Sequence, residues 1–87
     1  MHERTSVSST AWKEAAYDSS YETTMASLLR RRAEDADFSP EKARGILQHL
    51  YIQDGNDWGG RGELQDLQLQ AMIAAHEAFI AAWEREN

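Results

Sequence analysis

The residues best suited to chemistry lie in one glycine-rich segment. Residues 54–63 read DGNDWGGRGE and hold four of the chain's five glycines and one of its three tryptophans. Glycine permits backbone angles and close approaches that other residues forbid, so this composition favours a turn or a binding loop. Within the segment we single out a candidate interaction loop, made of Asp57, Trp58, Arg61 and Glu63.

The oxygen-bearing side chains of this segment suggest a calcium site, but their spacing argues against one. An EF-hand loop needs oxygen ligands at its positions one, three, five and twelve, with glycine at six. Counted from Asp54, position five is Trp58 and position twelve is Gln65, so an indole stands in place of a ligand and the bidentate Glu is missing. The sequence therefore predicts no metal site here.

An anion is a second possibility at the same segment. Gly59, Gly60 and Gly62 could expose backbone N–H groups at the start of the following helix, where the helix dipole favours negative charge. Arg61 could add a guanidinium. No strand precedes the segment, so the nucleotide-binding glycine motifs are absent. Side-chain carboxylates that cap the helix are the simpler interpretation, and a small anion or ligand binder stays as an alternative.

Trp58 itself has two interpretations. It either folds back and closes the open end of the helices, or faces solvent as an interaction hot spot, because Trp and Arg dominate such positions. The first interpretation is simpler, and it predicts that Trp58 is at least half buried near Tyr51 or Leu64. The neighbouring Arg61 keeps the second one open.

Catalytic chemistry has no organised site in the sequence. His76-Glu77 begins like the HExxH zinc motif, but Ile80 stands where the second His must be. His49 adjoins an apolar stripe, so a partly buried structural role is the simpler interpretation of both histidines. The chain has no cysteine, which excludes disulfides and thiol chemistry. We therefore expect no enzyme activity, no cofactor and no bound metal.

The N-terminal part of the chain should form a first helix. Its apolar residues recur at helical spacing, and they are Tyr17, Tyr21, Met25, Leu28 and Leu29. A start near residue 11 fits, and so does a start near residue 20, at the capping-box pattern of Ser19 to Glu22. The helix should end in the acidic stretch 34–37.

The second helix has the clearest start signal in the chain. Ser39 can accept a hydrogen bond from a free helix N–H, and Pro40 suits the first helical position. Phe38, just before the cap, can pack against the next turn. Gly55 is expected to end this helix in the left-handed conformation.

The third helix should run from about Gly62 to Arg85, and it is apolar over most of its circumference. A bulky face carries Leu69, Met72, Ile73, Phe79, Ile80 and Trp83. A small face carries Ala71, Ala74, Ala75, Ala78 and Ala82. A helix that is apolar all round is usually surrounded by other helices, and 87 residues offer few. We therefore expect a homodimer that uses the small face.

No segment shows the alternation of a strand, so the predicted fold class is all-α. We expect a small bundle of three main helices with a polar N-terminal segment that is flexible unless something pins it. The predicted organisation is a polar tail over residues 1–10 and a single helical domain over residues 11–87.

Charge and composition narrow the range of functions. The formal net charge is -6, and residues 63–87 carry five carboxylates against Arg85 alone. Nucleic-acid binding needs a positive surface, so we expect no nucleic-acid partner. No apolar run reaches the length of a membrane span or of a signal peptide, so we expect no membrane association and a cytoplasmic location.

These observations favour a non-catalytic protein–protein interaction or regulatory module, acting as a homo-oligomer or on a protein partner. An alternative is an acidic antagonist of the immunity or antitoxin type, which would turn the carboxylates of residues 63–87 against a basic target. The anion or ligand binder at the glycine-rich segment is the second alternative.

Overall fold

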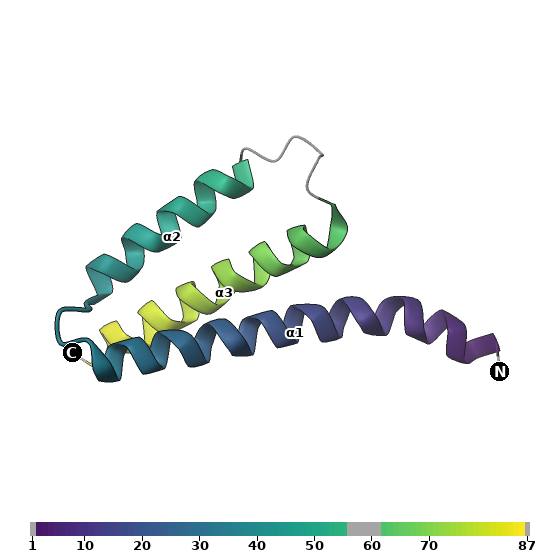
Figure 1. The fold of residues 1–87 in the computed structure, drawn as a ribbon, viewed down its shortest axis with the longest axis horizontal. Helices are drawn as coiled ribbons and strands as arrows, with labels where there is room; N and C mark the ends of the chain where they lie inside the picture. Colours follow the sequence, from purple (N-terminus) through teal and green to yellow (C-terminus); the bar gives the residue numbers. More distant parts are fainter. Residues whose placement is uncertain (1, 56–61, 87) are drawn as a thin grey trace.

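Three helices make up the fold. A computed structural model describes the backbone of residues 2–55 and 62–86, and within these ranges the side chains from residue 11 onward. The helices are α1 (His2–Glu34), α2 (Pro40–Gly55) and α3 (Glu63–Arg85), as Figure 1 shows. The described ranges contain no strand, so the predicted all-α bundle of three helices is confirmed.

The first helix starts earlier than its pattern indicated. α1 begins at His2, so both predicted starts, near residue 11 and near residue 20, are wrong. The capping-box residues Ser19 and Glu22 lie inside the helix. The physical reason is that no Gly or Pro occurs before Pro40, and a pattern able to start a helix does not interrupt one already running.

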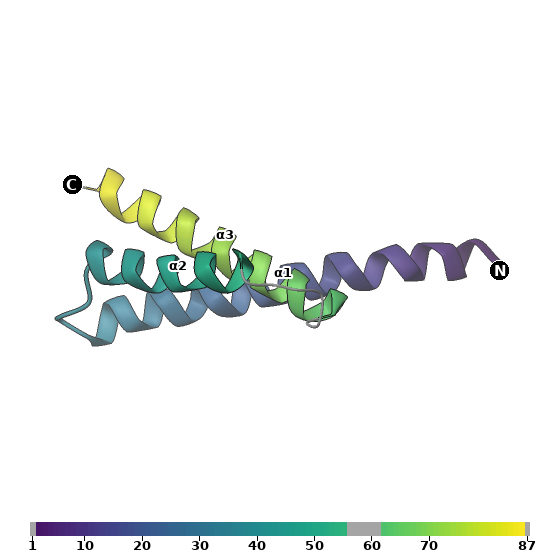
Figure 2. The ribbon, with the colours of Figure 1, turned by 90° about the horizontal axis from the view of Figure 1, so that it is seen from above.

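The long first helix sets the shape of the molecule. The extents are 51 × 29 × 20 Å, and a helix of 33 residues is about 50 Å long at 1.5 Å per residue. The N-terminal part of α1 runs beyond the other two helices, as Figures 1 and 2 both show. The helix thus covers residues 2–10 of the expected polar tail, and the division into tail and domain stays a prediction.

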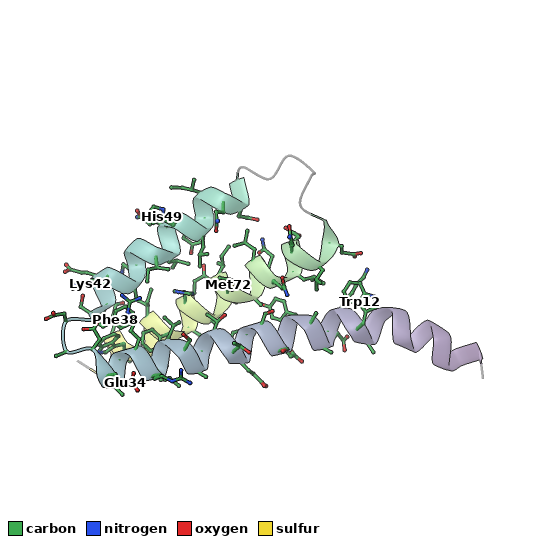
Figure 3. All side chains as sticks on the ribbon, viewed as in Figure 1. Trp12, Glu34, Phe38, Lys42, His49 and Met72 are labelled. Carbon is green, nitrogen blue, oxygen red and sulfur yellow. The ribbon has the colours of Figure 1, made fainter. Side chains whose placement is uncertain are left out.

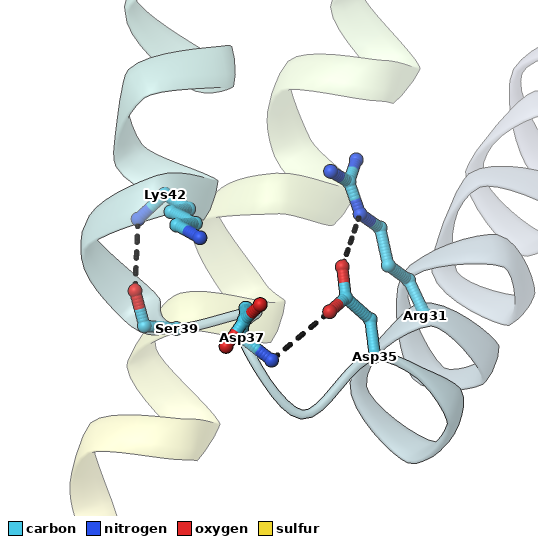
Figure 4. A network of polar contacts seen from close by, with 5 residues as sticks. All are labelled: Arg31, Asp35, Asp37, Ser39 and Lys42. Atoms are coloured by element: carbon cyan, nitrogen blue, oxygen red, sulfur yellow. Dashed lines mark hydrogen bonds and ion pairs between the residues drawn. The ribbon is translucent and has the colours of Figure 1, made fainter.

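The turn between α1 and α2 follows the predicted signals, and Figure 4 shows its polar contacts. α1 ends at Glu34, and the Asp37 N–H then donates to Asp35 Oδ1 at 2.9 Å. The N–H of Lys42 donates to Ser39 Oγ at 3.3 Å, which is the predicted capping bond. α2 begins at the next residue, Pro40, also as predicted.

The glycines behave differently from the prediction at the end of α2. Gly55 is the last residue of the helix and does not take the left-handed conformation, so the predicted left-handed stop is wrong. Within the described ranges the one residue with positive φ is Gly62, at 90°. Gly62 is the N-cap of α3 and has no side chain to offer as a cap. Its conformation favours glycine there, whereas a helix can end without a left-handed residue.

The core lies where the turn brings Phe38 onto α3. The Phe38 ring centroid is 6.2 Å from that of Phe79 and 5.8 Å from that of Trp83. Other buried apolar side chains from all three helices continue the core, namely Leu28, Ala43, Leu47, Leu50, Leu69, Ile73 and Ile80. The bulky face of α3 is therefore mostly buried inside the chain.

The position of α3 explains its two apolar faces. α3 packs against both α1 and α2, whereas α1 and α2 do not pack against each other in the described ranges. Ala71 and Ala75 are completely buried. They share a side of the helix with Gln68, which lines a cavity together with residues of α1, and with Glu86, which pairs with Arg32 of α1. Small residues on this side let a neighbouring helix approach closely.

Part of the small face is therefore used inside the molecule. Ala71 and Ala75 are fully buried inside the chain, so they offer no surface to a second copy. Ala78 and Ala82 stay exposed. The homodimer remains a prediction, but the complete small face of α3 is not available as its surface.

Candidate functional site

The candidate interaction loop is only partly visible. Glu63 is the first residue of α3, and its carboxylate pairs with Lys13 Nζ of α1 at 2.6 Å. Asp57, Trp58 and Arg61 lie outside the described residues, and so do the predicted burial of Trp58 and the predicted anion site. The structure therefore assigns Glu63 a place in the contact between α1 and α3.

Carboxylates of residues 63–86 pair with side chains of α1 and α2. The Arg32 guanidinium donates to both oxygens of Glu86, at 3.2 and 2.5 Å. The other contacts of this kind join Lys13 to Glu63, Arg44 to Glu84, and the Tyr51 hydroxyl, as donor, to Glu77. Asp66 also has a partner. The acidic surplus predicted to face a basic target is thus engaged inside the chain.

A groove opens on the side that α1 and α2 leave uncovered. It consists of two adjoining cavities of about 380 and 330 Å³, which share Thr23, Thr24 and Met72. The wider end is bounded by α1 and α3 alone, and α2 contributes Ile46 to the narrower end. Its further lining residues are Ser19, Ser20, Ser27, Leu28, Arg31, Gln68 and His76.

The wall that α1 gives to this groove is built from small hydroxyl residues. Ser20, Thr23, Thr24 and Ser27 recur at helical spacing beside the buried stripe of the helix. Serine and threonine can satisfy their hydroxyls on the carbonyl one turn earlier, so they suit a helix surface of this kind. Their small size leaves the space that leucines would fill. These residues were not among the predicted site residues, although their spacing along α1 could have indicated them.

His76 is the one polar residue buried among the described residues, at 5% exposure. Its Nδ1 lies 2.8 Å from the Met72 carbonyl oxygen. A carbonyl can only accept, so Nδ1 carries the hydrogen and Nε2 of the neutral ring is an acceptor. Nε2 has no hydrogen-bond partner within the described ranges, and the residue lines the 330 Å³ cavity. A donor that enters the groove could satisfy it.

The two histidines that were expected to be partly buried have different environments. His76 is buried as a floor residue of the groove. His49 is exposed, so the predicted burial is wrong for it. Figure 3 shows His49 on the side of α2 that faces away from α1. His49 therefore does not contribute to the groove.

The lining of the groove combines hydroxyl, imidazole and apolar side chains. No group of three or more His, Asp or Glu side chains in the described part of the chain is arranged to hold a metal ion. None of the described helices combines the length and the apolar character needed to cross a membrane. Comparison of the chain with protein-family models, with curated proteins and with solved structures found no match.

Proposed function

We propose that this chain is a non-catalytic protein–protein interaction module in the cytoplasm, and that its groove receives a helical segment of a protein partner. The observation that carries the proposal is the arrangement of the helices. α3 packs against α1 and α2, and the two outer helices leave an open side between them. A helix laid into such a groove can contact α1 and α2 at once, which is a common mode of recognition.

The lining supports recognition over catalysis. A hydroxyl nucleophile needs a base within hydrogen-bond reach, and within the described residues no hydrogen bond joins His76 to a serine or threonine of the wall. Leu28, Ile46 and Met72 offer apolar surface for a partner's side chains. Polar groups beside such apolar surface fix the orientation of what binds.

The acidic-antagonist alternative has less support. Glu77, Glu84 and Glu86 each have a partner on α1 or α2. A basic target would have to displace these internal contacts before it could use the carboxylates, and each displacement would weaken a contact between helices. The groove requires no such rearrangement.

Site-specific photo-crosslinking in cells tests the proposal. A benzophenone amino acid in place of Thr23 stands in the groove, and the same amino acid in place of Asp18 stands on another side of α1. Both native side chains are exposed, so the two positions form a matched pair. Protein adducts at Thr23 that are absent at Asp18 would support the proposal. Equal labelling at both positions, or none at Thr23, would contradict it.

A further inference from the structure

We draw no further inference here: the strongest candidate, the groove between α1 and α3 with the buried His76 at its floor, carries none because nothing in the structure shows what covers it.

Discussion

The guanidinium of Arg32 lies over the indole ring of Trp83, with its central carbon 4.3 Å from the ring centroid. The same guanidinium holds the Glu86 carboxylate through two hydrogen bonds. Since Trp83 also packs on Phe38, one side chain of α1 joins the end of α3 to the aromatic part of the core. The contact therefore links the last turn of α1 to the last turn of α3.

Arg32→Lys should lower the denaturation midpoint slightly. Lysine keeps the charge but has neither the planar fork that binds a carboxylate twice nor the flat face that stacks on an indole. Chemical denaturation followed by circular dichroism measures the change. Arg30→Lys is the matched control because the side chain of Arg30 is exposed, and an equal loss in both variants would contradict a specific role of Arg32.

The contribution of the Arg32–Glu86 pair should depend on pH. The hydrogen bond from Arg32 lowers the pKa of Glu86 from its ordinary value of 4.5. A carboxyl whose pKa is lower in the folded state stabilises the fold above its unfolded pKa and loses that contribution as the pH falls through its folded pKa. The midpoint difference between the parent and Glu86→Gln should therefore be present at pH 7 and shrink below about pH 4.5. A difference that stays constant down to pH 3 would show that the charge is not involved.

The Tyr51 hydroxyl should ionise later than an ordinary phenol. Its hydrogen bond to the Glu77 carboxylate raises the pKa of Tyr51 above 10.0, because the phenolate would lose that bond. The stabilisation from this contact is present below pH 10 and is lost as the pH rises through the raised pKa. Ultraviolet titration of the three tyrosines, compared with Tyr51→Phe, measures it. If the transition that Tyr51→Phe removes has the ordinary pKa of 10.0, the raised pKa of Tyr51 is contradicted.

Ser39→Ala should destabilise the fold by about 0.5–2 kcal/mol, the usual cost of losing an N-cap side chain. Its Oγ accepts the Lys42 N–H, and alanine would leave that group to water. Ser39→Asp restores an acceptor and should recover most of the loss. Urea denaturation of the parent, Ser39→Ala and Ser39→Asp measures these changes in stability. An unchanged midpoint in Ser39→Ala would mean that the cap contributes nothing.

Phe38→Ala should destabilise the fold by about 3–5 kcal/mol, the usual cost of removing a buried large aromatic side chain. Phe38 is only 5% exposed and packs against both Phe79 and Trp83. The matched control is Leu29→Ala, since Leu29 is 52% exposed and its truncation should change stability by less than about 0.5 kcal/mol. Similar losses in the two variants would show that the aromatic cluster is not central to the core.

The local features of this protein could be predicted from its sequence. The cap at Ser39, the first position at Pro40 and the end of α1 at Glu34 depend on residues within one or two turns of each other. The start of α1 could not be read in the same way. A capping-box pattern shows where a helix can begin. Whether the residues before the pattern are also helical depends on their own free energy of helix formation.

The candidate site depended on tertiary structure. Function was predicted at the glycine-rich segment, and no role was predicted for the hydroxyl residues of α1. Their side chains line a groove only because α3 separates α1 from α2, and no local pattern encodes the distance between two helices that do not touch.

For His76, too, one property could be predicted from the sequence and another depended on tertiary packing. The apolar residues around it in the sequence predicted that it is partly buried, because burial follows from its place on the apolar face of a helix. These residues could not predict that Nδ1 of His76 forms a hydrogen bond with the Met72 carbonyl oxygen, or that His76 lines a cavity. The sequence by itself determined three helices, their capping and the apolar character of α3. The tertiary packing decided which face stayed open, because hydrophobic burial is non-directional and many arrangements of three helices satisfy it.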